Sequence, residues 1–299
     1  MSKSRNSNRL AKKIHHQTSL TLATATRLAK QADVYLGTPV ADASDPDQRR
    51  LEAHVAHVLA SSFQDRQLNG ALLGVLAAQE ESQYLALTLE PVMANEILSE
   101  LLPRFDHFYG GIRGVPALRV RQTHERVVLL DALSSARITL TRADGGPMLL
   151  PSARDGEALL WKRVPLGLSR EEREEAEEWI DSRSIKKLRV RDVLLSRVLR
   201  RPGLVNRAAQ PHGFANCYTH HSGDLVIEWC CGDTAGAFCA NLAAHGFLDG
   251  LPRQKALELT SPRSARLGDS TLILNRHDSC LYGSGATEIV EYIRERYES

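Results

Sequence analysis

The sequence predicts an α+β fold with mostly antiparallel sheets and packed helices, arranged as two α+β lobes joined by a charged helical segment. Short apolar stretches with a period of two, separated by turn residues, indicate strands in the middle and last parts of the chain. Apolar residues at helical spacing lie on either side of them. Hydrophobic residues make up 42% and charged residues 25% of the 299 residues, which is typical of globular proteins.

These patterns divide the chain into four segments. Residues 37–47 contain two prolines and several aspartates, which indicates a linker after the first segment. The last segment repeats the order strand, strand, helix, which favours a small sheet with helices on one face. The segments are a basic helical N-terminal arm at 1–36, an α+β domain at 45–150, a charged helical connector at 151–207 and a small α+β domain at 208–299.

Two short helices are expected in the N-terminal arm. Leu10 and Ile14 give the first an apolar face, and Ala25 and Leu28 do so for the second. The hydroxyl residues at 18–21 fall where one helix stops and the next is capped. A complete DNA-binding helix-turn-helix needs a third helix, and the linker intervenes, so the arm is interpreted as a flexible or docking element with DNA contact as the alternative.

Capping patterns predict the starts of two longer helices. Asp45 suits the N-cap, Pro46 the first helical position and Gln48 the reciprocal capping position. Ser169 and Glu172 form a capping box ahead of an acidic helix.

Strands and further helices are predicted from the remaining apolar patterns. A helix beginning at Pro91 is expected to bury Val92, Ile97, Leu98 and Leu101. The predicted strands are 84–89, 117–121, 127–133, 136–141, 214–221, 224–229, 255–260 and 270–275, and the C-terminal helices are 234–245 and 286–297.

Charge is distributed unevenly along the chain. Residues 1–32 contain seven Lys or Arg and no acid, whereas the rest contains 31 basic and 36 acidic residues. A positive arm on a mildly negative body indicates a partner that is nucleic acid or an acidic protein surface. The candidate binding residues of the arm are Lys12, Lys13 and Arg27.

A second basic segment, 183–207, contains nine Lys or Arg and a single acid. On a helical wheel, five of these cations fall within about a third of the circumference, opposite leucines. Such a face is suited to a phosphate backbone or an acidic partner protein. Alternatively, the acidic helix at 171–181 pairs with it as a charged helical hairpin and cancels its charge. The five candidates are Lys186, Arg189, Arg197, Arg200 and Arg201.

Cysteine and histidine residues gather between 212 and 245, which raises the alternatives of a metal site and a catalytic Cys–His pair. Zinc needs four ligands that converge on one point. Cys217 and His220 would face opposite sides of the expected strand, and Cys217 and His221 would lie about 13 Å apart along it. A cysteine-rich core without metal or cofactor is therefore expected.

Two glycine-rich turns, 110–114 and 283–287, are candidate anion sites because a helix N-terminus or an arginine accompanies each. Neither has the pattern of a P-loop or of a dinucleotide fingerprint, so ordinary turns are expected. No apolar run reaches the ~20 residues that span a bilayer, and no secretory signal follows the basic start. The odd number of cysteines fits a reducing compartment, so a cytoplasmic protein without a membrane segment is expected.

The N-terminal arm resembles a segment at the start of many bacterial plasmid and mobile-element proteins. That segment has the form A-K-x-(apolar)…T-G-(apolar)-S-Y-x-x-A-L. In the present chain Ser19 stands for the Gly and Leu22 for the Tyr. The resemblance implies a bacterial protein carried by a transferable element and transfers no catalytic residue. It rests on Ala11-Lys12-Lys13-Ile14, Thr18-Ser19-Leu20, and Ala25 with Arg27-Leu28-Ala29.

Together these patterns give three hypotheses. The first is a non-enzymatic accessory protein of a bacterial plasmid or mobile element that binds another macromolecule. The second is a nucleic-acid-binding regulator that uses the basic arm and the basic helix, and the third is an enzyme with a Cys/His site at 212–285.

Overall fold

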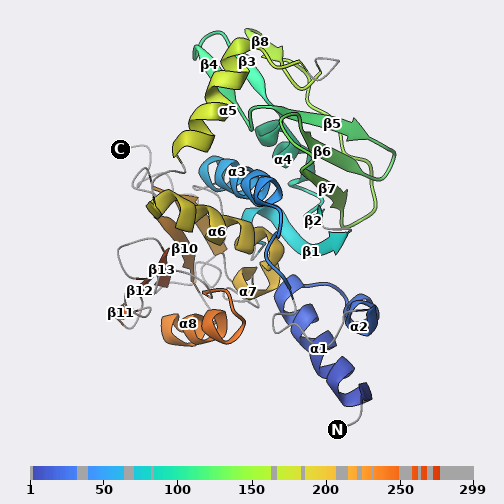
Figure 1. Ribbon diagram of the computed structural model, residues 1–299, viewed down its shortest axis with the longest axis vertical. Helices are drawn as coiled ribbons and strands as arrows, with labels where there is room; N and C mark the ends of the chain where they lie inside the picture. The colour runs from blue at the N-terminus through green and yellow to red at the C-terminus, as the bar shows by residue number, and fades with distance from the viewer. Residues whose placement is uncertain are drawn as a thin grey trace, which may run out of the picture.

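The computed structural model describes residues 3–31, 40–63, 71–81, 84–162, 167–182, 186–206, 215–220, 224–230, 232–248, 258–261, 264–267 and 272–276. Helices and strands are combined in open sheets, so the predicted α+β class is confirmed (Figure 1).

The first sheet has five strands in the order β1-β2-β7-β6-β5. Its neighbouring strands are antiparallel except β2 and β7, which run parallel. Alternate residues of β2 are buried, as expected for a strand with one face on the core. The strands are β1 (Val75–Glu81), β2 (Tyr84–Leu89), β5 (Leu118–Gln122), β6 (Val127–Asp131) and β7 (Arg137–Arg142).

The second sheet also has five strands, in the order β11-β12-β13-β10-β9. Strand β10 is buried along most of its length and pairs parallel with β13 and antiparallel with β9. Helix α8 (Ala235–Ala244) packs on β12 and β13. The strands are β9 (Ala215–Thr219), β10 (Leu225–Trp229), β11 (Glu258–Ser261), β12 (Ser264–Leu267) and β13 (Leu272–Arg276).

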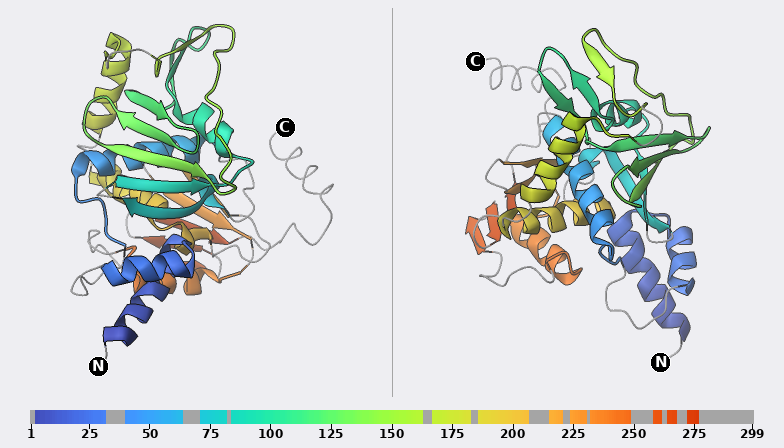
Figure 2. Two further views of the ribbon diagram at one scale, coloured as in Figure 1. Left: turned by 90° about the vertical axis from the view of Figure 1, so that its right-hand side faces the viewer. Right: turned by 45° about the horizontal axis from the view of Figure 1, so that its top comes forward.

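Two helices, α3 (Pro46–Ser62) and α6 (Lys186–Arg200), pack against each other between these sheets (Figures 1 and 2). Helix α3 contacts β7 and β9, and α6 contacts β1 and β10. Buried side chains from both sheets and both helices form one continuous core. The segment predicted as a connector therefore contributes its second half, including the short helix α7 (Pro202–Asn206), to the centre of the molecule.

A third, small sheet with the order β4-β3-β8 lies beyond the first sheet, and the acidic helix α5 (Arg170–Ser182) packs on β4 (Figure 1). A 3₁₀ turn (Leu72–Gly74) leads into β1, and α4 (Ala94–Leu101) leads into β3. The strands of the small sheet are β3 (Arg104–Asp106), β4 (Gly111–Arg113) and β8 (Glu157–Leu159).

The predicted helix starts are correct, but the reciprocal capping residues have other roles. The Asp45 side chain accepts the N–H of Asp47 at 2.8 Å, and the Ser169 hydroxyl accepts that of Glu172 at 3.1 Å. Gln48 instead exchanges two hydrogen bonds with the backbone of Arg137 on β7. In both helices the N-cap bond forms, but the residue expected to return it makes a tertiary contact instead, Gln48 with Arg137 and Glu172 with Arg119.

Some other predictions differ from the structure. Val92 is 82% exposed, because the chain forms a turn after Pro91 and α4 begins only at Ala94. Strand β1 was not predicted, and the helix expected at 286–297 lies outside the described residues. No helix in the described ranges combines the length and apolar character that crossing a membrane requires.

Candidate functional site

The N-terminal arm folds into two helices, α1 (Lys3–Thr18) and α2 (Leu22–Gln31), which pack against each other; we call residues 3–31 the basic hairpin. Ser19 has a φ of 57°, a left-handed conformation in which α1 cannot continue. The Thr21 hydroxyl then accepts the backbone N–H of Thr24 at 3.3 Å and begins α2. Between the helices lies a small core of Ala11, Ile14, Ala25 and Ala29.

The cations of the basic hairpin lie on the sides of the helices that face away from this core. Because each residue turns the helix by ~100°, Lys12 of α1 and Arg27 of α2 are directed away from the buried alanines. Residues 1–32 contain no acid that could pair with them. Within the described part of the chain, no ion pair is formed by the exposed side chains of Arg9, Lys12, Arg27 and Lys30 or by the half-buried Lys13.

The end of α1 docks the basic hairpin on α7 and α8. His16 Nε2 lies 3.1 Å from Asn241 Oδ1, and the His16 and His245 ring centroids are 4.6 Å apart. Gln17 Nε2 donates to the carbonyl of His245 at 3.4 Å. A Cβ on Gly203 would lie 2.3 Å from the His16 carbonyl oxygen, so only glycine permits α7 to approach α1 so closely.

We expect Gly203→Ala to destabilise the protein by about 1–3 kcal/mol and to undock the basic hairpin, because the added methyl meets backbone atoms that cannot turn aside. Urea unfolding measures the free energy of unfolding. Faster hydrogen exchange of the α1 amides would report undocking. Gly146→Ala is the matched control, because the nearest atom to its Cβ is the end of the Arg142 side chain at 3.3 Å. Equal effects of both substitutions would contradict the close approach.

Three of the predicted binding residues lie inside the protein. Arg197, Arg200 and Arg201, at the end of α6, are only 5%, 1% and 1% exposed. Arg200 forms a bidentate pair with Glu52 of α3, with Nε···O and Nη2···O distances of 2.8 and 2.7 Å. The three side chains, which were predicted to form a cationic surface for a partner, are instead buried and paired with carboxylates of the same chain. A helical wheel identifies their shared side of the helix, but it does not show which elements cover it.

The carboxylates that accept hydrogen bonds from Arg197, Arg200 and Arg201 come from α3 and from the segment before it. Asp42 accepts from Nη2 of Arg197 at 2.7 Å and from Nη2 of Arg201 at 2.8 Å. The acidic helix α5, considered above as the source of counter-charge, uses its buried Glu172 to pair with Arg119 of β5 at 2.7 Å.

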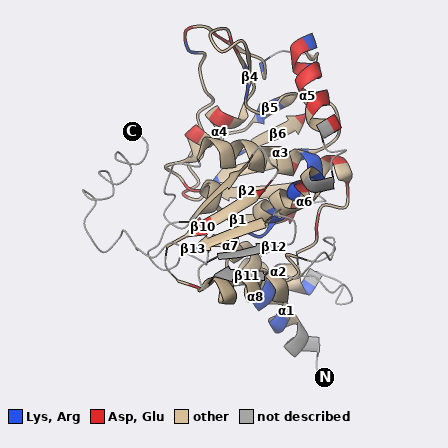
Figure 3. Cartoon of the chain, turned by 90° about the vertical axis from the view of Figure 1, so that its left-hand side faces the viewer, with Lys and Arg blue, Asp and Glu red and all other residues tan. Residues whose placement is uncertain are grey.

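The remaining candidates are divided between two elements. The structure brings Lys12, Lys13 and Arg27 together on the basic hairpin. Arg189 is exposed near the start of α6. Lys186 is the first residue of that helix, and the structure does not describe its side chain. Figure 3 shows the basic hairpin and the acidic helix α5 at opposite ends of the molecule. The basic hairpin is therefore the candidate site that retains uncompensated charge.

Two of the cysteines that the structure describes are core residues, and Cys231 and Cys280 lie outside the described residues. Cys217 and Cys230 are buried, and burial raises the pKa of Cys217 far above its ordinary value, which makes its thiol a poor nucleophile. Burial also raises the pKa of the half-buried Cys239 to about 11. His212 and His221 lie outside the described residues. Among the residues that are described, no group of three or more His, Cys, Asp or Glu side chains is positioned to hold a metal ion.

The first glycine-rich segment, 110–114, was expected to be a turn, but the turn ends at Gly110 and Gly111–Arg113 form strand β4. Its arginine is engaged locally. Arg113 Nε donates to Asp106 Oδ2 at 3.0 Å. The other oxygen of Asp106 accepts the N–H groups of Phe108 and Tyr109 at 2.9 and 3.0 Å. These hydrogen bonds, that from Tyr109 foremost, hold the pKa of Asp106 below its usual value. The second glycine-rich turn, 283–287, lies outside the described residues.

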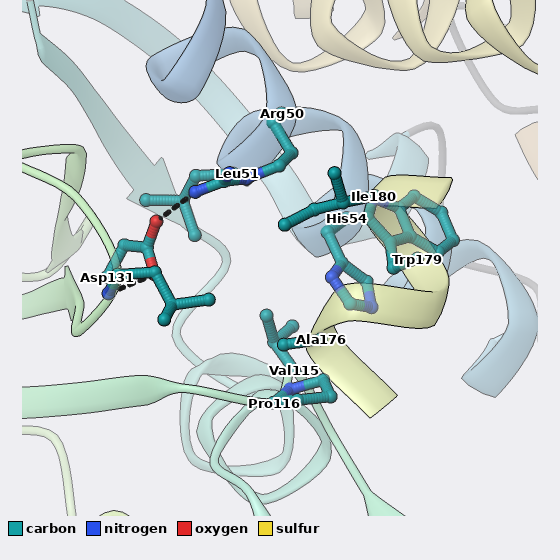
Figure 4. Close-up of a pocket in the computed structure, with 10 residues that line it drawn as sticks. Arg50, Leu51, His54, Val115, Pro116, Asp131, Ala176, Trp179 and Ile180 are labelled. Carbon is teal, nitrogen blue, oxygen red and sulfur yellow. Dashed lines mark hydrogen bonds and ion pairs between the residues drawn. The ribbon is translucent and has the colours of Figure 1, made fainter. Parts of the chain in front are cut away.

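A small pocket lies between α3, α5 and the end of β6 (Figure 4). Arg50 pairs with Asp131 on one side at 2.5 Å. His54 stacks on Trp179 on the other side, with ring centroids 4.1 Å apart. The pocket holds about 20 Å³, which is room for about one water molecule. It is too small to enclose a substrate.

Sequence reasoning found the basic hairpin but missed the residues that neutralise α6. Asp42 lies in a segment predicted as a linker, and Glu52 lies within a helix whose pattern showed only an apolar stripe. The one signal in the sequence was an excess of arginine at the end of α6, which requires carboxylates from elsewhere if that end is buried.

Comparison with protein-family models, curated proteins and solved structures gave no match to this chain.

Proposed function

We propose that this protein is a non-enzymatic accessory protein that binds another macromolecule through its basic hairpin. The observation that carries the proposal is the set of hairpin cations without an ion pair within the described residues, on a segment without any acid. Among the described residues, the buried arginines are by contrast each paired with a carboxylate. The resemblance of the same segment to plasmid and mobile-element proteins makes a bacterial transferable element the proposed setting.

The partner surface must be anionic and must contact several of these cations at once. A single exposed ion pair contributes about 0–1 kcal/mol, which cannot hold a complex together. Five such contacts made together give useful affinity, provided that the hairpin is held in one orientation. Its docking through His16, Gln17 and Gly203 provides that orientation.

Nucleic acid is the second candidate, and it makes a distinct prediction about salt. If all five cations contact phosphates, counterion release lowers the affinity for duplex DNA by on the order of 10²–10³ between 50 and 200 mM salt. The total absence of acid in residues 1–32 favours this candidate, because a nearby carboxylate would repel a phosphate backbone.

The test compares capture of host macromolecules by three forms of the tagged full-length chain. We expect replacement of Lys12, Arg27 and Lys30 by glutamine to reduce capture about tenfold, because three contacts of ~0.5 kcal/mol each are lost. All three side chains are exposed, so the fold is retained. The matched control replaces Arg121, Arg154 and Arg173, which are exposed on the body, and changes the net charge equally.

Nuclease treatment of the same lysate separates the two candidates. Loss of captured material on nuclease treatment, together with the steep salt dependence, identifies nucleic acid. Material that survives the nuclease and is lost only with the hairpin substitutions identifies a protein partner. Equal capture by the wild type and the hairpin variant would refute the proposal.

A further inference from the structure

A carboxylate is held between two buried guanidinium groups at the end of α6. Asp42 accepts from Nε and Nη2 of Arg197, at 3.1 and 2.7 Å, and from Nη2 of Arg201 at 2.8 Å. Its own side chain is 35% exposed, so the pair of arginines opens to solvent where Asp42 enters. We call Arg197 and Arg201 the arginine cradle.

The arginine cradle has more donors than Asp42 uses. Nε and Nη1 of Arg201 are buried, and neither has a hydrogen-bond partner within the described part of the chain. A buried donor without a partner costs about 1–3 kcal/mol. Burial, together with repulsion by Arg197 and Arg200, lowers the pKa of Arg201 below its usual value in spite of the nearby charge of Asp42. An anion with more oxygens and more charge than a carboxylate would offset the cost of this burial better.

Asp42 reaches the cradle on a short segment that is itself held by arginines. In residues 40–43, which we call the strap, the carbonyl oxygen of Val40 accepts from Arg201 and that of Ala41 from Arg200, at 2.7 and 3.2 Å. The carbonyl of Ala43 accepts from Arg49 at 2.8 Å. These contacts to the strap are all made by arginine side chains, which could equally well turn toward another oxygen-rich ligand.

We propose that the arginine cradle is a binding site for a phosphate group and that Asp42 occupies it in place of that group in this structure. A phosphate presents three or four oxygens to the forked donors of Arg197 and Arg201, which suit it geometrically. It would take over the bonds now made to Asp42 and engage Nε of Arg201, which shares an edge of the guanidinium group with Nη2. The strap would then leave the cradle. This proposal does not depend on the partner of the basic hairpin.

Because Asp42 belongs to the same chain as the arginine cradle, it competes with phosphate at a high effective concentration. Removing its charge therefore exposes the affinity of the cradle. We expect Asp42→Asn to be less stable than the wild type in chloride. We expect it to bind inorganic phosphate at least about tenfold more tightly, because intramolecular competitors act at millimolar or higher effective concentration.

The experiment measures thermal midpoints and titration calorimetry of the full chain with inorganic phosphate, at constant ionic strength against chloride. Asp144→Asn is the matched control, because Asp144 pairs with Arg142 at 2.6 Å on the surface. The site is supported if phosphate raises the thermal midpoint of Asp42→Asn in a saturable manner. The rise must be absent from the control and must be abolished by adding Arg201→Gln. A rise no larger than that of the control, or one that survives Arg201→Gln, overturns it.

Two further arms complete the test. Adenosine monophosphate replaces inorganic phosphate in a parallel titration. Binding of both ligands assigns the site to phosphate esters as well as to the free ion, and binding of phosphate alone assigns it to the ion. Binding of neither ligand overturns the proposal. If Asp42→Asn does not fold in chloride, it is refolded in phosphate. Recovery that requires Arg201 supports the site, and failure to recover overturns it.

Discussion

Replacing Glu52 with glutamine is expected to lower the free energy of unfolding by about 3–5 kcal/mol, because Arg200 stays charged and buried without its counter-ion. Both side chains are almost completely buried, and their two N···O distances are 2.8 and 2.7 Å. The Glu52 carboxylate also accepts the hydroxyl proton of Ser196 at 2.7 Å. Glu80 lies 3.8 Å from Arg200 but is 45% exposed, so it cannot replace Glu52.

Urea unfolding followed by circular dichroism measures this loss. The matched control is Glu174→Gln, which breaks the exposed pair of Arg170 and Glu174 and should cost less than ~0.5 kcal/mol. Adding Arg200→Met to Glu52→Gln should recover part of the stability, because the orphaned charge is then removed as well. A loss for Glu52→Gln no greater than that of the control would contradict the role given to this pair.

Replacing Glu172 with glutamine is expected to cost about 3–5 kcal/mol and to loosen α5 from the first sheet. The Glu172 carboxylate accepts from Nη1 and Nη2 of Arg119 at 2.7 and 3.0 Å. It also accepts the N–H of Ala117 at 3.0 Å, a residue held at a φ of 65°. The substitution therefore leaves one buried charge unpaired and weakens the support of a strained turn.

Hydrogen exchange of the α5 amides measures the loosening, and urea unfolding measures the stability. Glu177→Gln removes an exposed acid from the same helix and serves as the control. We expect faster exchange in α5 for Glu172→Gln alone. Unchanged protection of α5 would show that other contacts hold this helix.

Much of the fold could be predicted because its signals are local. Asp45 and Ser169 cap helices wherever those helices pack, since the bonds they make span only two or three residues. The hydroxyl residues at 18–21 mark the break between α1 and α2 for the same reason. Strand β2 spans the residues expected from its alternating pattern.

Other features could not be predicted because they depend on which elements meet. Gln48 and Glu172 have the sequence signature of reciprocal caps. In the folded chain Gln48 bonds to Arg137 and Glu172 pairs with Arg119 instead. The parallel pairing of β2 with β7 joins strands that are far apart along the chain. Val92 belongs to the apolar pattern of α4 but lies in the turn before the helix begins.

The candidate site shows the same division. Composition alone locates an acid-free basic segment at residues 1–32, and its amphipathic pattern makes it helical with its cations outward, because both properties follow from neighbours within a turn or two. The arginines of α6 have an equally clear cationic side. Their charge is instead buried against Glu52 and Asp42, which lie more than a hundred residues away in the chain, and only the packing of α3 and the strap onto α6 brings those carboxylates within hydrogen-bonding distance.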